Sequence, residues 1–253
     1  MLKKLKILFL SVLAIGLSSF LLYVYMDEVL PKGEQGEAAD KLADQMLSAI
    51  GDEAWQRTGA ISWAYEDRTY VWDKKRHFTK VVYEGREVLI DINDRVGYVV
   101  ANGEELAEAD QKALCEKAWR YWCNDSFWLN PISKIFDSGT QRRLVNWQGE
   151  EALLVTYTSG GATPGDSYLW LLDENNRPKS WKMWVSIIPV GGLKFSWDSW
   201  ETLETGVQIS THHFNPLRTI RIHEPVAAFH LNQLTNRDIF ALLLSDTSQL
   251  VNY

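Results

Sequence analysis

Hydrophobic residues follow three different patterns along this chain. Residues 7–26 form one run of twenty residues without a charge. At about 1.5 Å rise per residue, a helix of that length reaches across the roughly 30 Å hydrocarbon core of a bilayer. Between residues 34 and 57, apolar residues recur at every fourth position, which predicts an amphipathic helix. The residues of that stripe are Ala38, Leu42, Met46 and Ile50.

Beyond Gly59 the pattern changes to alternation, which is typical of half-buried strands. A first series of about five strands runs from residue 61 to 100 and closes at the turn Asn102-Gly103. A helical pattern then covers residues 104–122. A second series of about seven strands is expected at residues 142–147, 151–158, 167–172, 180–187, 195–203, 207–214 and 219–223.

These elements predict an α+β fold built on one strongly curved antiparallel sheet of about 11–12 strands. Such a sheet cannot stay flat, because strand twist makes it curl. The amphipathic helices must bury their apolar faces, so we expect a half-barrel wrapped around two or three helices. The expected division is a transmembrane segment at 1–26, the curved-sheet domain at 27–224 and a C-terminal extension at 225–253.

Charges on either side of the N-terminal run indicate its orientation. Lys3, Lys4 and Lys6 precede the run, and Asp27 and Glu28 follow it. Because a basic flank stays cytoplasmic, we expect a single-pass anchor in the inner membrane with the domain facing the periplasm. The alternative is a cleaved secretory signal, whose apolar region is usually about 7–15 residues long and ends in small residues. The longer run and its bulky end favour an uncleaved anchor.

The charge of the domain argues against nucleic acid as a partner. The formal net charge is −7, and −10 once the three N-terminal lysines are set apart. An acidic domain gains nothing from phosphate backbones.

Cys115 and Cys123 are the two cysteines of the chain. An exported domain meets an oxidising compartment, so a disulfide is one interpretation. On one continuous helix, however, residues eight apart have Cα atoms about 12 Å from each other, which is too far for a bridge. A bridge therefore requires the helix to break near Trp122.

The order of elements, a first helix, a strand meander, a helical insert and a second meander, resembles the LolA-like superfamily of LolA, LolB, RseB and LppX-type lipoproteins. Residues 165–173, GDSYLWLLD, look like the G-D-x-Y-x-x-x-x-D strand of some members. Residues 195–200 with Gly206 resemble their F…W…G hairpin. The resemblance covers roughly residues 36–224. It implies an apolar cavity between sheet and helices, which in known relatives holds acyl chains.

Large apolar side chains on one alternation face are the candidate walls of that cavity. They are Ile61, Trp63, Tyr65, Trp72, Trp128, Tyr168, Trp170, Trp181, Met183, Phe195 and Trp197. A tryptophan on the inner face of a sheet is also ordinary core, so both interpretations stay open for each residue.

Motifs that would carry catalysis are weak or absent. Gly165-Asp166-Ser167 is similar to a hydrolase nucleophile motif, but it enters an expected antiparallel strand, and Asp166 is better interpreted as a turn residue. His212 and His213 are adjacent and would point to opposite faces of a strand, so we expect surface or hydrogen-bonded histidines and no metal site. Phosphate-binding and dinucleotide-binding fingerprints are absent, so no cofactor and no enzymatic activity are expected.

Two functions therefore compete, and an unrecognised enzyme is a third alternative because catalytic residues need not be close in sequence. The first is a membrane-anchored periplasmic protein that holds a lipid acyl chain or a lipoprotein segment in an apolar cavity. The second is an interaction or sensor domain with a filled core that presents a surface to another envelope protein. An exposed apolar patch, around Trp119, Tyr121, Phe127 and Trp128, would favour the second.

Overall fold

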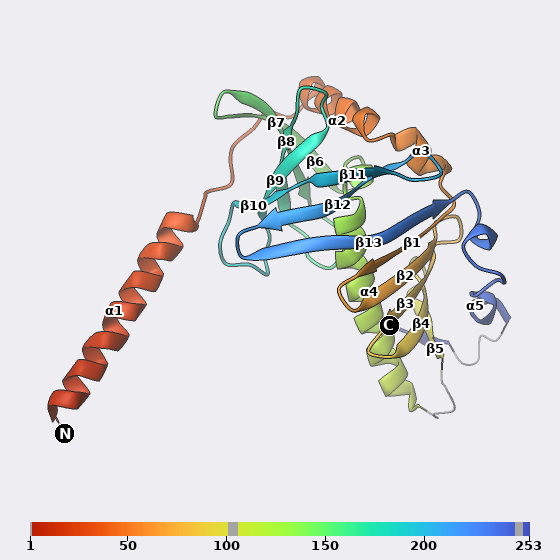
Figure 1. The fold of residues 1–253 in the computed structure, drawn as a ribbon, viewed down its shortest axis with the longest axis horizontal. Coiled ribbons are helices and arrows are strands. Elements are labelled where there is room, and N and C mark those ends of the chain that lie inside the picture. The colour runs from red at the N-terminus through yellow and green to blue at the C-terminus, as the bar shows by residue number, and fades with distance from the viewer. Residues whose placement is uncertain (1, 101–105, 246–249) are drawn as a thin grey trace.

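The computed structural model describes residues 2–100, 106–245 and 250–253. Figure 1 shows one helix standing apart from a body of strands that surrounds another helix. The α-helices are α1 (Leu2–Met26), α2 (Glu37–Ala49), α3 (Asp52–Arg57), α4 (Glu108–Leu129) and α5 (Ala241–Ser245). Two 3-10 turns are η1 (Ile132–Lys134) and η2 (Leu231–Gln233). The expected turn at Asn102-Gly103 lies outside the described residues.

The strands form two sheets, and every pairing within them is antiparallel. The nine-stranded sheet has the order β11-β12-β13-β1-β2-β3-β4-β5-β14. Its strands are β1 (Ala60–Tyr65), β2 (Arg68–Asp73), β3 (Phe78–Tyr83), β4 (Arg86–Asp91), β5 (Val96–Val100), β11 (Asp198–Thr202), β12 (Gln208–Asn215), β13 (Arg218–Ala228) and β14 (Val251–Asn252). The five-stranded sheet has the order β10-β9-β8-β7-β6. Its strands are β6 (Thr140–Trp147), β7 (Glu150–Tyr157), β8 (Ser167–Leu172), β9 (Pro178–Trp184) and β10 (Leu193–Ser196).

The α+β class is confirmed, but the structure has two sheets where one continuous sheet was expected. The difference arises in residues 195–203, which were predicted as a single strand. The chain breaks at Trp197, so β10 pairs with β9 while β11 pairs with β12. Ser199 follows the break with φ 53°, a conformation that redirects the chain. Trp197 is thus the corner where the chain passes from one sheet to the other.

The two sheets meet along a seam between β10 and β12. Hydrogen bonds between a side chain and the backbone cross it: Phe214 N donates to Ser196 Oγ over 3.0 Å, and Asn215 Nδ2 donates to the Lys194 carbonyl over 2.8 Å. Strands β10 and β12 are therefore not joined by the regular backbone hydrogen bonds that connect neighbouring strands within each sheet.

Helix α4 lies inside the body, against β3, β4 and β5 on one side and β12 on another (Figure 1). Helix α2 covers β6 and β7 with its buried residues Leu42, Ala43 and Met46. The predicted helix over 34–57 is divided into α2 and α3 at Gly51, whose φ of 73° is left-handed. The helical faces and both sheets share one hydrophobic core.

Helix α4 continues past Trp122 and ends at Leu129, with Asn130 as its C-cap just before Pro131. The sequence predicted an end near residue 122, but the aromatic side chains up to Trp128 provide enough apolar surface for another two turns. Cys115 and Cys123 therefore stay on one unbroken helix, and both are free thiols.

The C-terminal residues are integrated into the fold. Strand β13 runs through residue 224, where the boundary of the extension was expected. Beyond it, Phe240 and Leu243 pack against Phe78 and Leu89 on the outer face of the nine-stranded sheet. The short strand β14 then pairs with β5.

Helix α1 extends away from the body, and its described side chains are all exposed (Figure 1). Among the described residues, no helix combines the length and apolar character needed to span a bilayer. Several side chains of α1, including those at 19–23, lie outside the described residues, so the expected membrane anchor stays a prediction.

Candidate functional site

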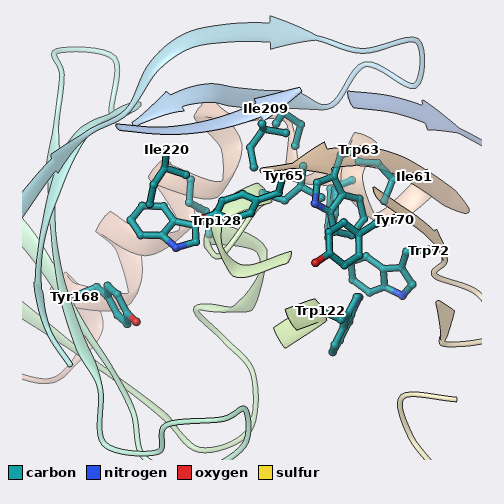
Figure 2. Close-up of a cluster of buried hydrophobic side chains, with 14 of the residues drawn as sticks. Ile61, Trp63, Tyr65, Tyr70, Trp72, Trp122, Trp128, Tyr168, Ile209 and Ile220 are labelled. Atoms are coloured by element: carbon teal, nitrogen blue, oxygen red, sulfur yellow. The ribbon is translucent and has the colours of Figure 1, made fainter. Parts of the chain in front are cut away.

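The structure gathers all eleven expected wall residues in the one core between the sheets. Each of them is at most 8 % exposed. Figure 2 shows Ile61, Trp63, Tyr65 and Trp72 on one side of Trp128, with Tyr168 on the other side. Strand alternation accounts for this arrangement, because Trp63 on β1 and Trp170 on β8 both occupy inward positions.

One part of this interior, which we term the His213 cluster, contains Trp128, Trp170, Trp181, Trp197 and His213. Ring centroids are 4.9 Å apart for Trp170 and Trp181, and 5.1 Å apart both for Trp170 and Trp197 and for Trp181 and Trp197. The His213 ring lies 4.2 Å from Trp197 and 5.4 Å from Trp128. Helix α4, both sheets and the corner between them thus contribute to one aromatic group.

Polar atoms in the His213 cluster lack hydrogen-bond partners. The indole nitrogens of Trp170, Trp181 and Trp197 are buried without an acceptor, and neither ring nitrogen of His213 has a partner of ordinary geometry. A buried polar group left in that condition costs about 1–3 kcal/mol. Burial lowers the pKa of His213 to about 3, so its ring is neutral at physiological pH.

The position of His213 corrects an expectation. The alternation of β12 places it on the same face as Ile209 and Thr211, and that face is the interior. His213 is therefore not a surface histidine, and the polar groups that act on its ring are the backbone groups of Ser196 and Trp128. His212 points to the other side, with Nδ1 3.9 Å from an Asp198 carboxylate oxygen, and His223 is exposed. In the described part of the chain, no three His, Cys, Asp or Glu side chains are grouped to hold a metal ion.

A second buried group, which we term the Asp125 cluster, contains Arg68, Tyr70 and Asp125. Arg68 Nε donates to Asp125 Oδ2 over 2.8 Å, the Tyr70 hydroxyl donates to the same oxygen, and Asn124 Nδ2 donates to Oδ1 over 2.7 Å. Burial raises the pKa of Asp125, and these hydrogen bonds oppose the rise. Because every neighbour donates, the geometry fits an ionised carboxylate that joins α4 to β2.

Aromatic rings surround the Asp125 cluster as well. Trp63 stacks on Tyr70 with centroids 4.6 Å apart, and Trp72 meets Trp122 at 5.3 Å (Figure 2). The indole nitrogens of Trp63, Trp72 and Trp122 also lack acceptors. Unpartnered indole donors are therefore present on both sides of α4.

The described residues form shallow hollows on the surface. One has a volume of about 400 Å³ and lies over the corner at Trp197, between the β8–β9 turn and the start of β11. Its polar lining includes Asp173, Arg177 and Asp198. The other, of about 470 Å³, lies between α2 and Asn175-Asn176. The first is adjacent to the His213 cluster because Trp197 belongs to both.

Sequence reasoning did not select His213, Asp125, Arg68 or Trp122 for the site. A signal existed for Asp125, which is the one acidic residue inside the aromatic-rich segment 119–128. Helix α4 is buried, and a buried carboxylate such as that of Asp125 requires a buried partner. Nothing in the sequence paired it with Arg68, which is 57 residues away.

Comparisons with known proteins identify no family for this chain. No family model and no curated protein matches it. Among solved structures it is similar to a DUF1329 family protein from Desulfovibrio piger ATCC 29098, with a TM-score of 0.35 and 8% sequence identity. The match covers 76% of this chain and 94% of that chain.

Proposed function

We propose that this chain is a periplasmic binding protein, held at the inner membrane by α1, that takes a lipid acyl chain or a lipoprotein segment between its two sheets. In this proposal the protein binds and does not catalyse. The order of its elements, which resembles that of LolA-like proteins, supports the proposal, as does the apolar run of α1.

The observation that carries the proposal is the set of unpartnered donors in the His213 cluster. Three indole N–H groups are buried among rings without a hydrogen-bond partner, and the His213 ring beside them makes no hydrogen bond of ordinary geometry. Acceptors are what the ester or phosphate oxygens of a lipid provide, while its acyl chain packs against the ring faces. Binding would thus satisfy groups that the protein alone leaves unsatisfied.

The seam between β10 and β12 is the expected entrance. It is crossed by the hydrogen bonds of Asn215 and Phe214 to β10, and the His213 cluster lies directly behind it. Strands β10 and β12 are not paired in either sheet, so separating them interrupts no regular strand pairing. The corner at Trp197 would act as the hinge of that movement.

The free energy of transfer limits what such binding can achieve. Burying an acyl chain from water gains about 0.8 kcal/mol per CH₂, but a lipid in a bilayer has already made that gain. The net gain must therefore come from polar contacts, and the unpartnered donors are the groups that would make them. This predicts selectivity for the oxygen-bearing part of the ligand rather than for its chain.

The second candidate function is an envelope interaction or sensor domain with a filled core. The observation that favours it is the close ring packing, in which Phe127, Tyr168 and Trp181 contact one another at 4.6–5.9 Å. In that case the interior is structural and the partner is another protein.

Native mass spectrometry of residues 27–253, purified without detergent and then extracted with solvent, distinguishes the two functions. The fragment retains the core, because none of the described side chains of α1 is buried. We expect a stoichiometric bound lipid. An empty monomer would contradict the proposal and favour the interaction domain.

A matched pair of variants tests the role of the donors. Trp197→Phe removes an unpartnered N–H, whereas Trp184→Phe removes an N–H that already donates to the Glu28 carbonyl over 2.6 Å. We expect Trp197→Phe to lower lipid occupancy and Trp184→Phe to leave it unchanged. Equal occupancy in both variants would show that the indole donor has no role in binding.

A further inference from the structure

The segment that follows α1 is fixed firmly to the five-stranded sheet. Glu28 N donates to the Gly191 carbonyl over 3.1 Å, and Gly191 N donates to Asp27 Oδ1 over 2.8 Å. The Glu28 carboxylate also pairs with Lys182 on β9. Further along, Glu34 and Leu144 exchange two backbone hydrogen bonds of 2.8 and 2.9 Å. The end of α1 is therefore held beside the β9–β10 loop.

Exposed apolar side chains gather at this end of the domain, and we term them the anchor-side rim. The rim consists of Ile187 in the β9–β10 loop, which is 74 % exposed, with Phe214 at 50 % and Leu217 at 77 % near the β12–β13 turn. The bond from Asn215 to Lys194 places that turn beside the start of β10. Figure 1 shows β10 and this turn on the side of the body nearest α1.

The loop that carries Ile187 has an apolar composition. Residues 185–192, VSIIPVGG, contain no charged side chain. Leu217 stands at the tip of its turn, where Leu217 N donates to Asn215 Oδ1 and the side chain projects freely. Three large apolar side chains at adjacent turns, all exposed, are more than the scattered single residues of an ordinary surface.

We propose that the anchor-side rim lies in the lipid surface, with Ile187 and Leu217 inserted among the head groups. This inference rests on the proposed function, because it requires α1 to be in the bilayer. One residue separates Met26, the end of α1, from Glu28, which is bound to the β9–β10 loop. The rim is thereby kept next to the bilayer, where a high effective concentration makes even weak insertion persistent.

Contact with lipid would also place the seam at the membrane. The two residues that bridge the seam, Phe214 and Asn215, border the rim. A lipid that leaves the bilayer would then enter between β10 and β12 without crossing water. The bilayer, rather than a soluble partner, would present the ligand.

Photocrosslinking in the full-length protein tests this proposal. The protein is reconstituted in nanodiscs of phosphatidylethanolamine and phosphatidylglycerol, with p-benzoylphenylalanine replacing Ile187, Leu217, Glu174 or Phe9 in separate samples. Glu174 is exposed in the turn at the opposite end of β9 and serves as the matched control. Phe9 lies in α1 and reports on the anchor itself.

We expect lipid adducts at positions 9, 187 and 217, with a several-fold excess of the latter two over position 174. Adducts at position 9 with only control levels at 187 and 217 would overturn the rim contact and leave the anchor intact. No adduct at position 9 would overturn the membrane attachment in the proposed function, and the rim contact with it. If positions 187 and 217 gave protein–protein adducts instead of lipid adducts, the rim would contact a second copy of this chain rather than the bilayer.

A second measurement uses the reporter at position 217. Ile187→Ser should reduce the lipid adduct at position 217 several-fold. The β9–β10 loop and the β12–β13 turn insert together, so weakening one weakens the other. Val226→Ser, which changes an exposed apolar residue on β13 away from the rim, should leave the adduct unchanged. Equal adducts in both variants would contradict the proposal.

Discussion

Asp125 and His213 are both completely buried in the same interior, yet their surroundings are opposite. Asp125 accepts hydrogen bonds from Arg68, Tyr70 and Asn124. The His213 ring makes no hydrogen bond of ordinary geometry at either nitrogen, and the backbone groups of Ser196 and Trp128 near it only partly offset its burial. The difference indicates that the Asp125 cluster holds α4 in place, while the His213 cluster carries polar groups that the folded chain does not use. Four measurements test this difference.

The largest effect is expected for Asp125→Ala. It leaves the Arg68 guanidinium, whose side chain is only 10% exposed, without its buried partner. Removing one member of a buried ion pair typically costs about 3–5 kcal/mol. Urea unfolding of residues 27–253 measures the loss.

Asp67→Ala is the matched control for this change. Asp67 Oδ1 also accepts from Arg68, over 3.2 Å, but its side chain is 72% exposed. We expect a loss below about 1 kcal/mol, as for other surface ion pairs. Similar losses for the two variants would show that Asp125 does not hold α4.

The pH dependence of stability is the next largest effect. Burial lowers the pKa of His213 from 6.5 to about 3 in the folded protein. The unfolded chain therefore binds a proton at a higher pH than the folded chain. The contribution of His213 to stability is complete above pH 6.5 and is lost, at about 1.4 kcal/mol per pH unit, as the pH falls towards 3.

Urea unfolding at several pH values, in the wild type and in His213→Leu, measures how the free energy of unfolding changes with pH and how much of that change is due to His213. We expect the wild type to lose more stability on acidification than His213→Leu. His212→Gln, at the half-exposed neighbour, should keep the wild-type slope. Identical slopes for wild type and His213→Leu would mean that the pKa of His213 is not lowered.

A smaller loss is expected for Tyr70→Phe, which removes one donor to the Asp125 carboxylate. Hydrogen bonds to charged groups contribute about 1.5–3 kcal/mol. Tyr157→Phe removes a hydrogen bond to the neutral carbonyl of Pro131 and should cost about 0.5–1.5 kcal/mol. The same unfolding measurement compares them, and a smaller loss for Tyr70→Phe would argue against an ionised Asp125.

The smallest effect is expected for His213→Leu at neutral pH. Because the ring makes no hydrogen bond of ordinary geometry, replacing it with an apolar side chain should change stability by less than about 1 kcal/mol or increase it. The free energy of unfolding in urea at pH 8 measures this. A loss above about 2 kcal/mol would show that His213 has a stabilising partner, and the contrast with Asp125 would disappear.

Much of the fold could be predicted because its signals are local. The stripe of Leu42 and Met46 identified α2, and alternation around Trp63 and Trp170 identified inward faces correctly. The prediction of one sheet was wrong because nothing local shows that Trp197 is a corner. The end of α4 was also misplaced, since its last turns are stabilised by contacts of Trp128 with distant strands.

The sequence by itself determined which residues are apolar, which alternate and which interrupt a helix, because these depend on neighbours a few positions away. It therefore determined the α+β class and the buried faces. The three-dimensional packing is what brings Arg68 to Asp125, buries His213 without a hydrogen bond of ordinary geometry, and fixes Glu28 beside the β9–β10 loop. The physical reason is that these contacts join residues between 57 and 154 positions apart, or depend on which groups surround a site once the two sheets have closed around α4.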